Sequence, residues 1–202
     1  MTDRLAATEA GIARAAELLR DGEVVAFPTD TVYGVAVAAS RADRIDALFA
    51  IKRRPTDRRI PMLVASLAQA VEAGGEADER ARALSDRFWP GALTIVLRSV
   101  DGAETQAFRA PDHPVALALI RAAGPLLATS ANRSDEPDTL AADDVLIAFA
   151  MEQDALAAVV DGGVVPGGVA STVIDLSVTP AQVHRVGPIT HAQLAEVVEL
   201  AP

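Results

Sequence analysis

The chain has 202 residues, of which 50 % are hydrophobic and only 3 % aromatic, so its core must be packed mainly with alanine, valine, leucine and isoleucine. Its 18 basic and 28 acidic residues give a formal net charge of −10, which argues against a broad nucleic-acid-binding surface but leaves room for a local basic pocket. The absence of cysteine excludes disulfides, thiolate nucleophiles and cysteine-based zinc sites.

The first 20 residues form an amphipathic segment that includes Asp3 and Glu9. They fit neither a signal peptide nor a membrane anchor, and no stretch approaches the ~20 uninterrupted apolar residues that a membrane span needs. We therefore expect a cytoplasmic protein without membrane association. The length favours a single domain over residues 1–202, with a core from about residue 5 to about residue 198 and no additional C-terminal domain.

Hydrophobic spacing and turn residues predict the elements of the first half of the chain. In order, we expect a helix over 8–20, strands over 24–27 and 32–38, a helix over 41–53, a strand over 60–65, and helices from Ser66 and through 82–88. The segment 29–31 follows Pro28, which cannot donate to a sheet ladder, and should form a loop.

The second half begins after a turn at 89–91. The predicted elements are strands over 92–98 and 106–109, a helix over 114–123, a strand over 125–129, a helix over 141–149, strands over 157–160, 171–176 and 182–186, and a last helix with Leu194, Val197 and Val198 inward. About seven strands with interspersed helices indicate an α+β domain of the α/β type on one mixed sheet. The sequence does not define the order of the strands.

The usual nucleotide-binding and hydrolytic signatures are absent. No G-x-x-x-x-G-K-[ST] or G-x-G-x-x-G motif occurs, no Ser-His-Asp set is compelling, and the three histidines lie far apart without metal-ligand spacing. Polar residues instead follow apolar strands, which is where open α/β sheets tend to bind ligands. Candidate residues are therefore sought at strand ends.

Lys52 is a charged residue at an inward position. Helical spacing from Ile45 and Leu48 places it on the apolar stripe of its predicted helix. Because an unpaired buried charge is costly, such a lysine needs an anionic partner, which nearby aspartates or a bound phosphate would supply. A basic helix end also has a simpler interpretation, since it complements the helix dipole.

Three other polar segments have an ordinary structural interpretation beside a functional one. The segment 29–31 is either a turn or a hydroxyl set for a small polar ligand. Ser130 and Asn132 either begin a turn or supply donors, and Gly162 and Gly163 suggest a flexible turn. Taken singly, each segment favours the structural interpretation, and only their joint order changes that balance.

Eight short motifs follow one another from Gly22 to about Leu194. They are PTDTVYG at 28–34, K-x-R-P at 52–55, WPGALT at 89–94, R-x-P-x-H-P at 109–114, TSAN at 129–132, DGG at 161–163, STVID at 171–175 and HRVG at 184–187. This order resembles the threonylcarbamoyl-AMP synthases of the YrdC-type family. The resemblance implies a YrdC/RibB-like fold, in which a twisted mixed sheet flanked by helices surrounds a central concave cavity.

The resemblance also implies a reaction. L-threonine and bicarbonate would form a carbamate that attacks the α-phosphate of ATP and releases pyrophosphate, as the first step of tRNA N6-threonylcarbamoyladenosine synthesis. Mg²⁺ would arrive with ATP and not through protein side chains. Downstream tRNA threonylcarbamoyl-transferase proteins would be partners, and tRNA contact would be weak at most. Since the attacking oxygen belongs to the substrate, the protein needs no nucleophile of its own.

Individual roles follow from the same resemblance. Lys52 and Arg54 would be catalytic and face the triphosphate and the carbamate. The residues implied to bind L-threonine are Thr29, Arg109, Ala128 and Ser171. The residues implied to bind ATP are Lys52, Thr56, Thr105, Ser130, Asn132, Asp138 and Arg185. Asp138 stands where the family commonly has a nucleotide-contacting serine.

Two other hypotheses stay open. One is a paralogue that handles another carbamoyl acceptor, which the altered stretch around Asp138 would allow. The other is a non-catalytic RNA-binding module, which the net charge of −10 and the low aromatic content disfavour.

Overall fold

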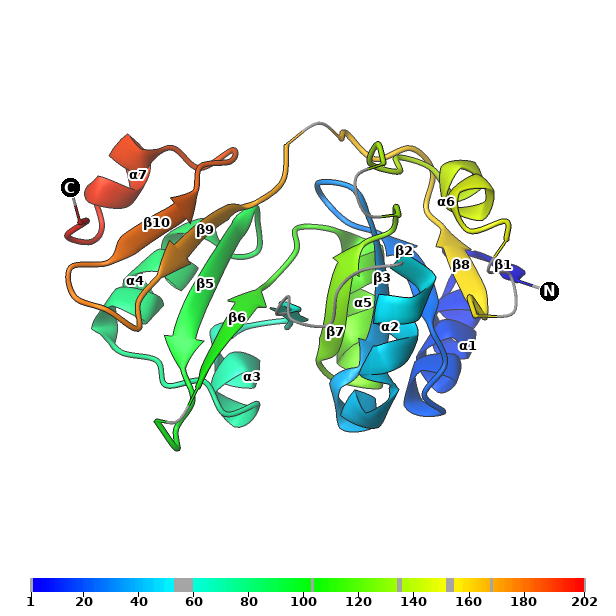
Figure 1. Ribbon diagram of the computed structural model, residues 1–202, viewed down its shortest axis with the longest axis horizontal. Helices are drawn as coiled ribbons and strands as arrows, with labels where there is room; N and C mark the ends of the chain where they lie inside the picture. The colour runs from blue at the N-terminus through cyan, green and yellow to red at the C-terminus, as the bar shows by residue number, and fades with distance from the viewer. Residues whose placement is uncertain are drawn as a thin grey trace.

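The chain folds around one continuous mixed sheet, shown in the computed structural model of Figure 1. The structure describes residues 2–52, 60–102, 104–133, 136–151, 155–167 and 169–201. The strands in these ranges are β1 (Asp3–Ala6), β2 (Val25–Pro28), β3 (Tyr33–Ala38), β4 (Met62–Leu63), β5 (Leu93–Arg98), β6 (Thr105–Arg109), β7 (Leu126–Ser130), β8 (Ala158–Asp161), β9 (Thr172–Asp175) and β10 (Gln182–Arg185). The helices are α1 (Glu9–Arg20), α2 (Ile45–Lys52), α3 (Leu67–Glu72), α4 (Glu79–Phe88), α5 (Pro114–Ala123), α6 (Ala142–Ala148) and α7 (His191–Ala195), with a 3-10 segment η1 (Ala39–Arg44) before α2.

Parallel and antiparallel pairs are mixed along the sheet, whose order is β1-β8-β2-β3-β7-β4-β6-β5-β9-β10. β1, β8 and β2 run parallel, whereas β2, β3, β7 and β4 are antiparallel in turn. Farther along, β4 with β6 and β5 with β9 are parallel, and β6 with β5 and β9 with β10 are antiparallel. The mixed sheet predicted from the sequence is confirmed, with ten strands in the described ranges where about seven were expected.

One half of the sheet is covered by helices on both faces, with α1 and α5 on one side and α2 and α6 on the other (Figure 1). β2 divides its side chains between the two cores, since Val25 and Phe27 pack with α1 and α5 while Ala26 packs on the opposite face. A strand buried on both faces is apolar at every position. This double burial explains the unbroken apolar runs at 24–27 and 32–38.

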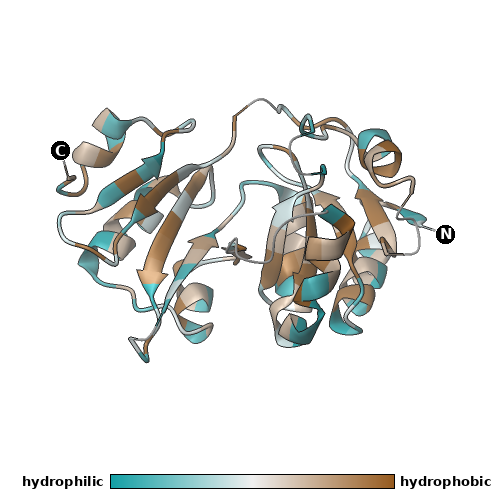
Figure 2. Ribbon diagram, in the orientation of Figure 1, coloured by the Kyte–Doolittle hydropathy of each residue, from teal (hydrophilic) through white to brown (hydrophobic). Residues whose placement is uncertain are grey.

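The other half of the sheet buries one face only, against α3, α4 and α7 (Figure 1). Leu84 of α4, Ile95 of β5 and Ile174 of β9 belong to this core. Because side chains alternate along a strand, Thr94 points to the opposite face of β5. In Figure 2 the strands of both halves are predominantly hydrophobic, while hydrophilic residues gather on the helices and turns.

Several boundaries differ from the sequence prediction. β1 was missed because three of its four residues are exposed, so it has no hydrophobic period and is defined by its pairing with β8. The predicted strand at 60–65 is reduced to the two residues of β4. The predicted helix over 41–53 begins with the 3-10 segment η1, in which Arg41 is not helical, and becomes an α-helix at Ile45.

α1 begins where the sequence predicts a helix. The Thr8 hydroxyl accepts a hydrogen bond from the Gly11 N–H at 3.3 Å, which satisfies one of the free donors of the first turn. Within the described ranges, no helix is both long enough and apolar enough to cross a membrane.

We expect Leu119→Ala to lower the free energy of unfolding by about 2–5 kcal/mol, because Leu119 is fully buried between α5 and the sheet and its removal leaves a cavity. Leu117→Ala on the same helix is the matched control, since Leu117 is only partly buried and should cost less. Urea unfolding of both variants measures the difference. Equal losses would contradict the assigned packing of α5.

Candidate active site

A cavity of about 520 Å³ lies where the two halves of the sheet meet. Its volume is within the usual range for small-molecule sites. Its lining contains most of the residues that the sequence analysis singled out, namely Thr29, Lys52, Arg109, Ala128, Ser130, Asn132, Asp138, Ser171 and Arg185. Segments more than 100 residues apart in the sequence therefore form one site.

Lys52, the last residue of α2, is buried with 3 % of its surface exposed, as its helical position predicted. Its Nζ donates to the Ser130 carbonyl oxygen at 2.5 Å, to Ser130 Oγ at 3.2 Å and to Asn132 Oδ1 at 3.3 Å. These three oxygens are neutral groups that help to solvate the buried ammonium. Lys52 also lines the cavity, so it contributes positive charge to the cavity wall.

Asn132 is held in a fixed orientation by both ends of its amide. Its Oδ1 accepts from Lys52, and its Nδ2 donates to the Glu136 carbonyl oxygen at 2.6 Å. Ser130 ends β7, paired with Gly34 of β3. The Lys-x-Arg and Ser-x-Asn motifs thus meet directly through Lys52, although nearly 80 residues separate them.

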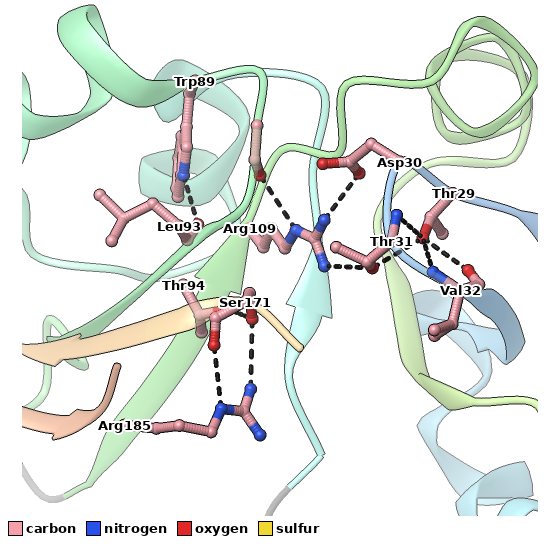
Figure 3. A network of polar contacts seen from close by, with 11 residues as sticks. Thr29, Asp30, Thr31, Val32, Trp89, Leu93, Thr94, Arg109, Ser171 and Arg185 are labelled. Carbon is pink, nitrogen blue, oxygen red and sulfur yellow. Dashed lines mark hydrogen bonds and ion pairs between the residues drawn. The ribbon is translucent and has the colours of Figure 1, made fainter. Parts of the chain in front are cut away.

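Arg109 ends β6 and is 8 % exposed. Its Nε donates to the Gly91 carbonyl oxygen at 3.0 Å, its Nη1 to Thr31 Oγ1 at 3.2 Å and its Nη2 to Asp30 Oδ1 at 2.6 Å (Figure 3). A guanidinium has five N–H donors, so these three bonds leave two for a ligand. The sequence analysis missed Asp30 and Thr31 as partners, because nothing in their spacing from Arg109 signals contact.

Thr29 forms a turn with its own neighbours. Its Oγ1 accepts from the backbone N–H groups of Thr31 and Val32 at 3.2 and 3.3 Å, and it donates to the Val32 carbonyl oxygen at 2.6 Å (Figure 3). The hydroxyl proton of Thr29 is thereby used within the loop. Thr29 lines the cavity. Its hydrogen bonds also shape the loop that carries Asp30 and Thr31.

A second polar group forms the opposite wall. Ser171 Oγ lies 2.8 Å from Thr94 Oγ1, and Arg185 donates to Ser171 through Nε to the carbonyl oxygen at 2.9 Å and through Nη2 to Oγ at 3.3 Å (Figure 3). Partial desolvation lowers the pKa of Arg185, the nearby charge of Arg109 adds to this, and Asp138 opposes it. Arg185 is therefore held by Ser171, and charges of both signs act on it.

The Asp161-Gly162-Gly163 segment is anchored and is not the flexible turn that its glycines suggested. The buried Tyr33 hydroxyl donates to the Gly163 carbonyl oxygen at 2.8 Å and accepts from the Gly162 N–H at 3.2 Å. A Cβ on Gly162 would lie 2.6 Å from Pro28 Cγ, so a larger residue does not fit there. Burial raises the pKa of the Tyr33 hydroxyl and keeps it a donor.

Among the described site residues, Thr105 is not part of the cavity lining. Arg54 and Thr56 lie outside the described residues. Thr105 lies at the far end of β6, paired with Arg98, and four strand rises place it roughly 13 Å from Arg109. Its nucleotide contact stays a prediction. Thr31, Thr94 and Arg133 also line the cavity and were not predicted.

The charge of the cavity wall is opposite to that of the whole chain. Among the described lining residues, the cations are Lys52, Arg109, Arg133 and Arg185, and the one anion is Asp138. Such a wall concentrates anions, in a protein whose net charge is −10. The fold and site therefore define an α/β protein with a positively charged cavity between two halves of one sheet.

Comparison with known proteins places the chain in a family. Residues 17–187 match the Sua5/YciO/YrdC family model, whose description is telomere recombination. The chain belongs to this family. It is 42 % identical over 209 aligned residues to the threonylcarbamoyl-AMP synthase of Bacillus subtilis, covering 98 % of this chain and 59 % of that protein.

Solved structures agree with this placement. Pyrococcus abyssi Sua5, in a crystal structure complexed with L-threonine, superposes with a TM-score of 0.89 at 34 % identity, covering all of this chain and 63 % of that one. Escherichia coli YciO superposes with a TM-score of 0.80 at 22 % identity, covering 93 % and 97 %, and supports the fold alone. The chain thus spans about three fifths of the Bacillus and Pyrococcus proteins.

His113 caps α5 and makes folding stability depend on pH. Its Nδ1 accepts from the Val115 N–H at 3.3 Å, and this requires an unprotonated Nδ1. Desolvation lowers the pKa of His113, while Asp30 and Asp112 act in the opposite direction.

We expect the free energy of unfolding to fall as the pH decreases below the ordinary histidine pKa of about 6.5. The unfolded chain is protonated there, whereas native His113 takes up its proton only at lower pH, so acid favours unfolding. Urea unfolding near pH 7.5 and near pH 5.5 measures this decrease in the free energy of unfolding. The decrease should be smaller for His113→Asn than for the wild type, because asparagine caps helices without titrating. An identical loss in both proteins would refute this role.

Proposed function

We propose that this chain is a threonylcarbamoyl-AMP synthase. L-threonine, bicarbonate and ATP would yield L-threonylcarbamoyladenylate and pyrophosphate, the first step of tRNA N6-threonylcarbamoyladenosine synthesis. The observation that carries the proposal is the buried Lys52 held by Ser130 and Asn132 in a cavity that also holds Arg109. The shared family and the names of the relatives support the same activity.

The reaction requires positioning and charge stabilisation. The threonine amine adds to bicarbonate with loss of water, and a carbamate oxygen then forms a bond to the α-phosphorus while the bond to pyrophosphate breaks. Both reactants are anions that repel each other, so the barrier falls when fixed cations hold them together. Lys52 would face the phosphates, and the three oxygens that orient its ammonium support this role. Arg54 would assist it.

Arg109 would bind the threonine carboxylate. Asp30, Thr31 and Gly91 hold its guanidinium in place and leave two N–H groups unused. A planar guanidinium binds a carboxylate through two parallel hydrogen bonds. Ala128 and Ser171 would complete the threonine site, with Thr29 shaping its loop. Asp138 and Arg185 would lie beside the nucleotide.

Mg²⁺ is proposed as part of the substrate MgATP. No cluster of three histidine, aspartate or glutamate side chains that could hold a metal occurs in the part of the chain that the structure describes. In this proposal the phosphates of ATP would bind the ion. We further propose that residues 1–202 act as one unit in the cytoplasm and pass the labile product to tRNA threonylcarbamoyl-transferase proteins.

The activity itself is tested by pyrophosphate release. Purified protein with MgATP should release pyrophosphate only when both L-threonine and bicarbonate are present, and mass spectrometry should detect the adenylate. Other amino acids in place of threonine test for a paralogue with another acceptor. Release that does not depend on threonine, or no release, would reject the proposal.

We expect Lys52→Met to reduce kcat/KM by roughly a hundredfold to a thousandfold, because it removes a preoriented cation from the developing charge. Ser130→Ala should have a smaller effect in the same direction, since the Ser130 carbonyl oxygen remains for Lys52. Steady-state kinetics with varied ATP measures both. Unchanged activity in both variants would exclude this site.

We expect Arg109→Lys to raise the KM for L-threonine roughly tenfold to a hundredfold while changing the KM for ATP much less. Lysine keeps the charge but cannot bind a carboxylate through two parallel bonds. Kinetics with each substrate varied in turn separate the two effects. A larger change for ATP than for threonine would move Arg109 to the nucleotide half of the site.

A further inference from the structure

We propose that Thr94 and Ser171 together recognise the side-chain hydroxyl of the amino-acid substrate, an assignment that rests on the proposed function. Thr94 is 4 % exposed and Ser171 5 % exposed, yet both line the cavity. Their hydroxyl oxygens lie 2.8 Å apart (Figure 3). Thr94 would thus be a specificity-determining residue for the same reaction.

The direction of the surrounding hydrogen bonds leaves one proton unused. Arg185 has only donors, so Ser171 Oγ must accept from it. If Thr94 then donates to Ser171, the Ser171 proton remains. If Ser171 donates to Thr94, the Thr94 proton remains. Within the described ranges neither hydroxyl has another partner, so in both arrangements the pair keeps one donor and two lone pairs.

This combination matches a hydroxyl better than a carboxylate. A hydroxyl both donates and accepts, so it uses the free proton and a free lone pair together. A carboxylate only accepts hydrogen bonds, so its oxygens would be repelled by the free lone pairs of the Thr94 and Ser171 hydroxyls. An analogue that lacks the hydroxyl would leave these buried polar groups without a hydrogen-bond partner. Because unpaired buried polar groups are costly, the site should bind that analogue more weakly.

The position of Thr94 in the sheet suits a substrate of this shape. Its register partner on the neighbouring strand β9 is Val173, which also lines the cavity. The neighbouring strand on the other side of β5 is β6. Phe108 of β6 pairs with Ile95 of β5, and Arg109 is the next residue of β6. In the proposed arrangement the substrate carboxylate lies at Arg109, its hydroxyl at Thr94 and Ser171, and its methyl group against Val173, all of which line the same cavity.

The test compares L-threonine with L-2-aminobutyrate, which differs only by lacking the hydroxyl. Calorimetric titration of the wild-type protein should show at least roughly tenfold tighter binding of L-threonine. Thr94→Val, which removes the hydroxyl at nearly constant volume, should reduce this preference roughly threefold to tenfold. Thr94→Ser should restore it, and in the pyrophosphate assay Thr94→Val should raise the KM for threonine without raising that for ATP.

Thr179→Val is the matched control, since Thr179 is exposed and outside the cavity lining. Ser171→Ala gives an independent measurement if Thr94→Val does not fold. Equal binding of both amino acids by the wild type, or an unchanged preference in the hydroxyl-lacking variants, would overturn the inference. Selective threonine binding without any pyrophosphate release would instead reject the proposed function and leave the recognition intact.

Discussion

A positive charge buried inside the protein constrains the rest of the structure. Lys52 ends α2 and reaches the end of β7, so these distant segments must meet for its ammonium to be solvated by protein oxygens. Without those oxygens the buried charge would be strongly destabilising. Folding this half of the sheet therefore also builds one wall of the cavity, with Ser130 and Asn132 oriented as part of the same contact.

The second constraint is the connection between the two halves. Arg109 belongs to the half whose strands bury one face, and its guanidinium reaches Asp30 and Thr31 in the half that is buried on both. A buried ion pair of this kind is weak evidence for stability, because desolvation offsets much of its attraction. The ion pair between Arg109 and Asp30 does, however, fix the position of the guanidinium relative to the loop at 29–31.

The two halves bring different chemistry to the cavity. The doubly covered half presents the ammonium of Lys52 with its oxygen partners, whereas the other half presents hydroxyls and guanidinium groups at Thr94, Ser171 and Arg185. Both halves therefore contribute polar groups to the same cavity. In the proposed reaction, these groups would hold the two substrates next to each other.

The sequence by itself determined the main elements, the mixed sheet and the inward position of Lys52. These follow from apolar periodicity, which acts locally along the chain. Nine of the residues that the motif resemblance singled out also line the cavity. Only the tertiary structure decided the strand order, the pairing of Asp30 with Arg109 and the contact of Thr94 with Ser171. Those contacts join residues more than 70 positions apart, and no spacing rule extends across such a distance.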